Sequence, residues 1–351
     1  MSSLVESLTR AMTTTGYAPS TMTTSTGTSN NLYGYWGKPT ASVDWCESNY
    51  QHSHYIAETF NTISNLWYII SALLFLWHTR SFYRKMFGVG FKYGKGPLQG
   101  LATNNNFIHE PLLRFPIIGL SVAMVGVGSW MFHMTLQVRD QMWDELSMHL
   151  PILSLLYSLW NHREYVNYHH GQRVLMNMFL SKDHLLSFMA SVSLFILLLS
   201  IYNVHTPLLF IGTFFFEMIF SYHFSMQVAN SSGGKSNTCE HHRAQKKKLI
   251  RLVFASFILA FTVWNMDKAF CGVGMIDALK LHSFWHLFTA YGCYLWGTFL
   301  MYGYYADKHD YLVSIGKIEN DNKGYVINWK AFVLPWIEFD INYDSLKSER
   351  A

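Results

Sequence analysis

The chain has 351 residues, of which 50% are hydrophobic and 17% aromatic, whereas only 14% are charged. A typical soluble domain carries about 25% charged residues, so this composition argues against a soluble globular protein. The net charge of +4 is modest, and no basic patch interleaved with aromatic residues indicates a nucleic-acid-binding protein. The four cysteines have no CxxC spacing, which argues against a cysteine zinc knuckle.

The N-terminal segment, residues 1–32, is rich in Ser, Thr and Gly. It has too few apolar residues to build a packed core, so it is predicted to be a disordered tail. A basic stretch followed by an apolar core is missing from it, and a cleavable signal peptide is therefore not expected.

Seven stretches carry the roughly 20 mostly apolar residues that a bilayer-spanning helix requires. They run approximately over residues 58–77, 112–136, 143–160, 184–202, 207–226, 249–266 and 281–302. The predicted fold is therefore an all-α membrane protein with a bundle of seven transmembrane helices. The bundle is expected over residues 33–305, followed by a cytosolic C-terminal tail over residues 306–351.

The connections between these stretches differ in their content of basic residues. Lys and Arg cluster in the first, third and fifth connections. The other side holds Arg10, Lys38, Arg139, Lys268 and Lys280. Because cytosolic loops carry the excess of basic residues, the N-terminus is predicted to face the lumen or exterior and the C-terminus the cytosol. The glycosylation sequon at Asn230 then lies in the cytosol and is expected to be unmodified.

The cysteines fall into different compartments under this topology. Cys46 and Cys271 are in non-cytosolic segments, where disulfides persist. Cys239 is in a cytosolic loop and Cys293 is inside a span, so neither is a natural partner for them. A Cys46–Cys271 bridge would tie the loop before the first span to the loop before the seventh. Two free thiols are the alternative.

Histidines within the apolar stretches are the strongest chemical signal. His282 and His286 have the i, i+4 spacing that places two side chains on one helix face. His133 lies near the end of the second span, which ends on the same side of the membrane as the seventh begins. Three protein ligands with an open fourth position are typical of a catalytic zinc site. The alternative is three unrelated histidines, each hydrogen-bonded within the bundle.

Two polar neighbours suggest that this site is hydrolytic. Ser129 lies one helical turn before His133, and its hydroxyl is suited to support a developing oxyanion. Asp144 opens the third span on the same side and is suited to proton transfer from water to a leaving nitrogen. The alternatives are a small helix-packing residue for Ser129 and an acid that favours the helix dipole for Asp144. Glu145 fits that second alternative better.

The loop before the first span is acidic, with oxygen-bearing side chains at Asp44, Glu47, Asn49 and Glu58. Calcium takes six to eight oxygen ligands of this kind, although the spacing is not that of an EF-hand. On composition alone, a calcium site and a solvated acidic turn both remain open. The other loop histidines are expected at the surface: His52, His54, His169, His170, His241 and His242.

Several ordered blocks of this sequence resemble the alkaline ceramidases. They are residues 33–37 (YGYWG), 44–50 (DWCESNY), 55–58 (YIAE), 61–65 (NTISN), 128–136 (GSWMFHMTL), 144–146 (DEL), 264–267 (WNMD) and the pair His282 and His286. Each block is short, but their combination and order are specific. They extend from residue 33 to the seventh span.

The resemblance implies a seven-helix enzyme of the endoplasmic reticulum or Golgi membrane that hydrolyses the amide bond of ceramides, including phytoceramide or dihydroceramide. It implies zinc ligation by His133, His282 and His286, with Ser129 and Asp144 as catalytic groups. It also implies calcium binding by Asp44, Trp45 through its carbonyl, Glu47, Asn49 and Glu58, and it supports the Cys46–Cys271 disulfide. The long N-terminal tail, the basic first connection and residues 228–248, which look like an insertion, depart from the family pattern.

Two other functions remain open at this stage. The first is a seven-helix zinc-containing lipid receptor with little hydrolase activity. The second is a transporter, which is disfavoured by the scarcity of charges within the spans and by the lack of an evident inverted repeat. Protein partners are not indicated by the sequence, and the expected partner is the ceramide lipid itself.

Overall fold

The computed structural model describes residues 33–87, 111–169, 207–231, 237–314, 324–330 and 333–340. The predicted tail over residues 1–32 and the predicted fourth span over residues 184–202 lie outside the described residues. The chain divides into the units Met1–Leu32 and Tyr33–Ala351, and all the structure below belongs to the second.

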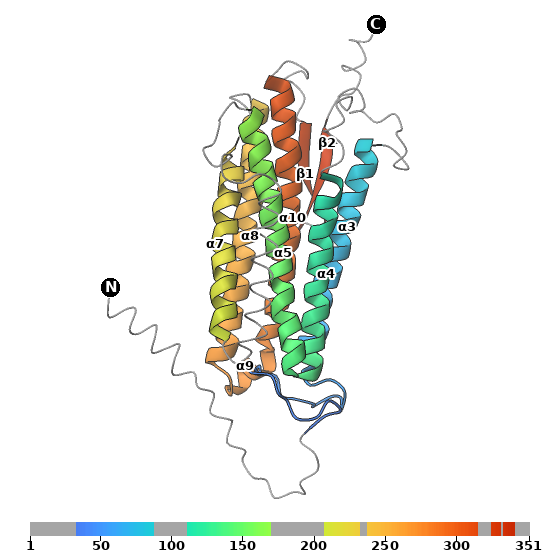
Figure 1. The fold of residues 1–351 in the computed structure, drawn as a ribbon, viewed down its shortest axis with the longest axis vertical. Helices are drawn as coiled ribbons and strands as arrows, with labels where there is room; N and C mark the ends of the chain where they lie inside the picture. The colour runs from blue at the N-terminus through green and yellow to red at the C-terminus, as the bar shows by residue number, and fades with distance from the viewer. Residues whose placement is uncertain are drawn as a thin grey trace, which may run out of the picture. The chain divides into compact units, whose positions relative to one another are not determined.

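Long helices account for most of the described chain (Figure 1). They are α3 (Leu66–Phe87), α4 (Pro111–Thr135), α5 (Val138–His169), α7 (Pro207–Asn230), α8 (Asn237–Ala269) and α10 (Leu281–Ser314). Two short helices, α2 (Thr59–Ser64) and α9 (Gly274–Leu279), precede α3 and α10. Each predicted span within the described residues therefore coincides with a helix. In α5, α8 and α10 the helix continues well beyond the predicted apolar segment.

The surfaces of these helices carry large apolar side chains. Leu73, Leu113, Phe216, Ile219 and Ile258 are each at least 61% exposed. Apolar surface of this extent is typical of helices that face lipid. Among the described helices, three stretches are long and apolar enough to cross a bilayer: Thr59–Arg84, Leu113–Thr135 and Asn237–Ala269. These features indicate a membrane protein.

The interior of the bundle is built around α10, which packs against α8, α3, α5 and α4. Large side chains of α10, among them Trp296, Phe299 and Tyr302, are fully buried in the main core. In a membrane, lipid tails are as apolar as these side chains, so close van der Waals packing between the helices, rather than transfer from water, holds this core together.

The α4–α5 connection positions the site described below. It consists of Leu136 and Gln137, and Leu136 adopts a positive φ of 50°. Near it, a Cβ on Gly128 would lie only 2.9 Å from the carbonyl oxygen of Trp143 and from Oγ of Ser147. A glycine is therefore required for α4 to approach α5 this closely, next to Ser129 and Asp144.

The structure departs from the sequence-based expectations in two features, a C-terminal hairpin and the start of α8. First, β1 (Gly324–Lys330) and β2 (Leu334–Asp340) form an antiparallel hairpin, with Gly324 opposite Asp340 and Lys330 opposite Leu334. The fold is therefore not purely α-helical. The hairpin lies against α10, α3 and α8, and Tyr302 of α10 donates its hydroxyl to the carbonyl oxygen of Tyr325 at 3.2 Å.

Second, α8 begins at Asn237, so the polar segment that precedes the predicted sixth span is part of a helix. His242, predicted at the surface, is fully buried in this helix. The prediction was wrong because the partners that bury this polar side chain come from α10. His52 and His54, by contrast, are exposed as expected.

Candidate metal centre and hydrolytic site

The structure brings together the three histidines that the sequence singled out. His133 lies in the last turn of α4, and His282 and His286 lie on adjacent turns at the start of α10. Their ring centroids are 5.1 Å (133 to 282), 5.0 Å (133 to 286) and 4.8 Å (282 to 286) apart. All are buried, and one ligand atom of each lies within 4.8 Å of the others. The spacing allows all three to contact one metal ion.

Hydrogen bonds orient the outer edges of two of these imidazoles. Nδ1 of His133 lies 2.5 Å from Oε2 of Glu58, and Nδ1 of His286 lies 2.7 Å from Oγ of Ser64. These contacts leave the Nε2 atoms of both rings available. Metal-ligating histidines typically use their second nitrogen in this way.

Buried nitrogens without partners test whether the site fits a metal. Nε2 of His133 and Nδ1 of His282 are buried and accept or donate no hydrogen bond. Buried polar groups are almost always paired, so a ligand that binds several imidazole nitrogens at once would satisfy this cluster. The donor set of three imidazoles fits zinc.

The backbone explains why Glu58 reaches His133. The segment before α2 docks onto the end of α4, where the N–H of Ala57 donates to the carbonyl of Met134 and the N–H of Glu58 to the carbonyl of His133, each at 3.0 Å. Glu58 is completely buried, and its Oε1 also accepts the N–H of Trp45 at 3.1 Å. One carboxylate thus joins the N-terminal loop to a histidine of the cluster.

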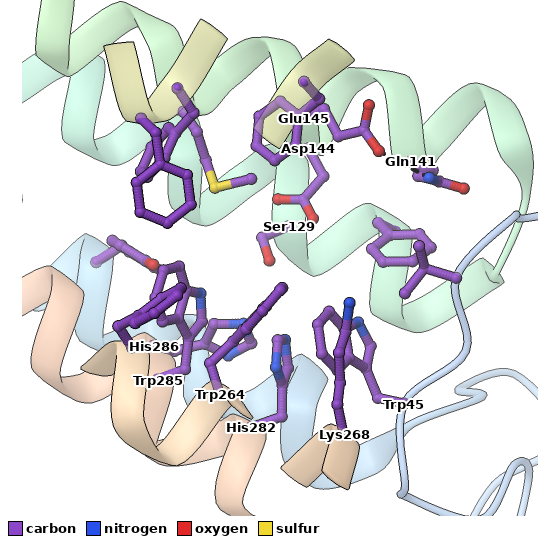
Figure 2. Close-up of a pocket in the computed structure, with 18 residues that line it drawn as sticks. Trp45, Ser129, Gln141, Asp144, Glu145, Trp264, Lys268, His282, Trp285 and His286 are labelled. Carbon is purple, nitrogen blue, oxygen red and sulfur yellow. Dashed lines mark hydrogen bonds between the residues drawn. The ribbon is translucent and has the colours of Figure 1, made fainter. Parts of the chain in front are cut away.

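A cavity opens beside the histidines (Figure 2). Its polar end holds His282, His286, Ser129 and Asp144, and Figure 2 shows the Asp144 carboxylate next to Ser129. Most of the remaining wall is apolar and includes Val43, Phe132, Met148, Phe210, Phe214, Phe215, Phe261, Trp264 and Trp285. A long apolar chain with one polar, hydrolysable group matches this division.

Asp144 lies beyond the first turn of α5, where an acid would favour the helix dipole. Because α5 begins at Val138, Asp144 and Glu145 lie in its second turn, and Asp140 is the acid of the first turn. Oδ1 of Asp144 is buried and has no hydrogen-bond partner. Glu145 also lines the cavity, where its Oε1 accepts a hydrogen bond from Gln141 at 2.7 Å. The expectation that Glu145 serves the helix N-terminus was therefore wrong.

The side chain of Trp45 has a position that the sequence analysis did not foresee. Its indole stacks on the His282 ring, with centroids 3.6 Å apart and planes at 19°. Lys268 lies over the rings of Trp264 and Trp45, with its Nζ 4.0 Å and 4.9 Å from the centroids. Both side chains line the cavity. In the sequence, only the density of aromatic residues around Trp45 and Trp264 could have indicated that Trp45 and Lys268 lie at the site.

Among the predicted calcium ligands of the acidic loop, Asp44 and Asn49 lie side by side, whereas Glu47 is bonded elsewhere. Nδ2 of Asn49 lies 3.2 Å and 3.3 Å from the two oxygens of Asp44. Burial, followed by the charge of Glu58, raises the pKa of Asp44 to about 6. The carboxylate of Glu47 instead accepts the N–H groups of Phe60 and Asn61 at 2.8 Å each. In this arrangement Glu47 stabilises the first turn of α2.

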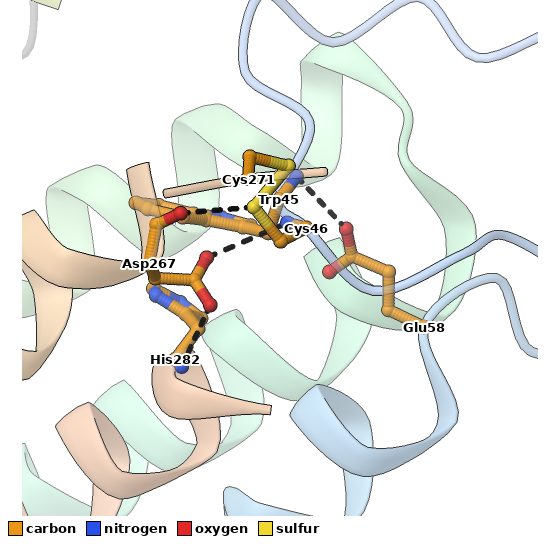
Figure 3. The surroundings of a disulfide bond; sticks show 6 residues. All are labelled: Trp45, Cys46, Glu58, Asp267, Cys271 and His282. Atoms are coloured by element: carbon orange, nitrogen blue, oxygen red, sulfur yellow. Dashed lines mark hydrogen bonds between the residues drawn. A yellow bond between two sulfur atoms is a disulfide. The ribbon is translucent and has the colours of Figure 1, made fainter. Parts of the chain in front are cut away.

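A disulfide joins Cys46 to Cys271, as predicted (Figure 3). Asp267 lies beside it and was not singled out as a site residue. Its Oδ2 accepts the N–H of Cys46 at 3.4 Å, and its Oδ1 accepts the N–H of His282 at 3.3 Å. The disulfide and Asp267 therefore hold the N-terminal loop against the helix that carries His282.

Comparisons with known proteins identify the family of this chain. A model of the family described as Ceramidase matches residues 37–316. A Dictyostelium discoideum protein named "Putative alkaline ceramidase dcd3A" is 31% identical over 80% of this chain and 92% of its own length. An alkaline ceramidase of Saccharomyces cerevisiae is 26% identical over 86% of each chain, and alkaline ceramidase 3 of Mus musculus is 26% identical over 77% of this chain and 86% of its own. The chain therefore belongs to the ceramidase family of hydrolases.

Proposed function

We propose that this protein hydrolyses the amide bond of ceramides, including phytoceramide or dihydroceramide, to a free sphingoid base and a fatty acid. The observation that carries this proposal is the convergence of the three-histidine cluster with Ser129 and Asp144 at the polar end of an apolar cavity. The family membership supports the same reaction. A ceramide has the matching chemistry, since its two apolar chains flank a single amide.

His133, His282 and His286 would hold a zinc ion in this proposal. When bound, zinc supplies Lewis-acid chemistry that polarises a carbonyl and lowers the pKa of water. The chain itself supplies the orientation of the ligands, because Glu58 and Ser64 contact the outer nitrogens of His133 and His286. The buried surroundings strengthen every electrostatic contact made there.

Asp144 and Ser129 would carry out the proton transfers and the charge stabilisation. Asp144 lines the cavity, its Oδ1 has no hydrogen-bond partner, and its carboxylate is suited to take a proton from the attacking water and return it to the departing amine. The Ser129 hydroxyl donates a hydrogen bond to the amide oxygen as negative charge develops on it. The apolar wall excludes bulk water from this step.

The N-terminal loop would hold calcium through Asp44, the carbonyl of Trp45, Glu47, Asn49 and Glu58. Support comes from the contacts of Asp44 with Asn49 and from its nearness to the buried carboxylate of Glu58, which place two carboxylates close together in this loop. A divalent cation would relieve their repulsion. Because Glu58 also contacts His133, calcium bound here would stiffen one side of the zinc site.

The membrane arrangement completes the proposal. Seven spans, a lumenal or exterior N-terminus, a cytosolic C-terminus and a location in the endoplasmic reticulum or Golgi membrane would place the histidine site near the non-cytosolic surface. The apolar helix surfaces support insertion in a bilayer.

The purified full-length protein in ceramide-containing detergent micelles is expected to release equal amounts of sphingoid base and fatty acid. Removal of metal with a strong zinc chelator should stop the reaction, and added zinc should restore it. The competing function is a zinc-containing lipid receptor. Protein that binds zinc and ceramide but releases no sphingoid base would establish the receptor instead.

Calcium is expected to support the reaction through the loop. A chelator that binds calcium but is too weak to strip zinc should lower activity, and added calcium should restore it. Asp44→Asn should weaken this response, because the substitution removes one charged oxygen ligand. The matched control is Ser48→Ala, which changes an exposed residue of the same loop. An activity that does not respond to calcium in the wild type would exclude a regulatory calcium site.

A further inference from the structure

A second cluster of metal-ligating side chains lies near the other end of α10. It consists of His242 from α8 and of His309 and Asp310 from α10, each at most 2% exposed. One ligand atom of each lies within 4.8 Å of the others. Since an α-helix rises about 1.5 Å per residue, His309 is about 40 Å along α10 from His282. The cluster is therefore separate from the hydrolytic site.

The contacts within this cluster leave several polar atoms without partners. Nδ1 of His242 lies 2.7 Å from Oδ1 of Asp310, so this pair uses one oxygen of the carboxylate. Oδ2 of Asp310 and both ring nitrogens of His309 are buried without a hydrogen bond. The separation of 3.9 Å between Nδ1 of His309 and Oδ1 of Asp310 is too long for one. Unpaired buried polar atoms of this kind are rare, and a shared ligand would satisfy them.

The charges around the cluster leave room for a cation. Lys246 lies one turn after His242, and its Nζ contacts Oδ1 of Asp307 at 2.6 Å and the carbonyl oxygen of Ser231 at 2.7 Å. The carboxylate of Asp307 thus compensates the charge of Lys246. Asp310 remains as an anionic ligand, and the imidazoles of His242 and His309 lie beside it.

We propose that His242, His309 and Asp310 form a second zinc-binding site. Two imidazole nitrogens and one carboxylate oxygen are a donor set that zinc binds with a fourth position left for water, whereas calcium and magnesium prefer oxygen ligands alone. The ion joins α8 to α10 beside the hairpin, where the ring centroid of Tyr325 in β1 lies 6.1 Å from that of His309. Zinc here stabilises the end of the bundle remote from the hydrolytic site.

Metal content of the purified full-length protein tests this proposal. With both sites filled, the wild type should contain about two zinc ions per chain, measured by elemental mass spectrometry. The His309→Ala protein should contain about one zinc ion fewer per chain. His241→Ala is the matched control, since it replaces the neighbouring histidine on α8 that is not part of the cluster, and it should keep the wild-type content. An unchanged zinc content in His309→Ala overturns the proposal.

A second comparison needs no substitution in the cluster. His286→Ala removes a ligand of the hydrolytic site, so about one zinc ion per chain should remain if the second site exists, and none should remain if it does not. Asp310→Asn, which keeps the shape of the side chain, gives an additional comparison should His309→Ala fail to fold. If the hydrolytic site holds no zinc, the zinc content of His286→Ala equals that of the wild type, while His309→Ala still contains one zinc ion fewer. The zinc proposal for the hydrolytic site and the zinc proposal for the second cluster can therefore fail independently.

Discussion

Replacing His286 with alanine is expected to lower ceramide hydrolysis by about 10³-fold or more, because loss of the metal removes several kcal/mol of transition-state stabilisation. His286 contributes one of the imidazoles in the cluster and is held in place by Ser64. The zinc content of the hydrolytic site should fall together with the activity. The measurement is the initial rate of sphingoid-base release, with zinc determined on the same sample.

The control for this substitution is Phe284→Ala on the same turn of α10. Phe284 is 43% exposed and is not among the residues that line the cavity. The Phe284→Ala protein should retain zinc and most of the activity. This comparison separates the loss of a metal ligand from a general disturbance of the helix. Hydrolysis at the wild-type rate by the His286→Ala protein would show that the cluster is not the reaction centre.

Replacing Asp144 with asparagine is expected to lower kcat by about 10²–10⁴-fold, which is the usual contribution of a general acid–base group. Asparagine has nearly the same shape, so it should preserve packing in α5 but cannot accept a proton from water at neutral pH. Zinc content should remain at the wild-type level, because Asp144 is not a member of the histidine cluster. Steady-state kinetics measure the fall in kcat, and metal analysis of the same protein measures the retained zinc.

Glu145→Gln is the matched control for Asp144→Asn. Glu145 is the next residue of α5 and also lines the cavity, but its carboxylate is engaged by Gln141. Its substitution should therefore change kcat by less than about 10-fold. If the glutamine variant were the more damaged of the two, the proton-transfer role would have to be reassigned to Glu145. Loss of zinc in Asp144→Asn would instead make Asp144 a ligand-positioning residue.

The sequence predicted the helices that are described here because each apolar segment is long enough to be recognised by itself. It also predicted the Cys46–Cys271 disulfide and the approach of His133 to His282 and His286, which the structure confirms. These predictions needed only the spacing of the histidines and the alternation of spans across the membrane. Neither depends on the detailed packing between helices.

The polar part of α8 could not be predicted in the same way. A segment rich in Lys and His has the composition of a solvated loop, and nothing within it shows that His242 and Lys246 are buried. Their burial depends on Asp310 and Asp307, which arrive from α10 more than sixty residues later. Buried charged groups need such partners, and only the packed bundle reveals them. The hairpin was missed because its strands depend on contacts with the tyrosines of α10.

The sequence by itself thus determined the apolar helices, the residue types of the histidine site and the family. Only the tertiary structure decided how these residues are held. It shows that Glu58 and Ser64 orient His133 and His286, that Trp45 stacks on His282, and that Glu145 lines the cavity. The physical reason is that hydrophobic segments carry their signal locally, whereas the orientation of a buried polar side chain depends on partners that folding brings from distant parts of the chain.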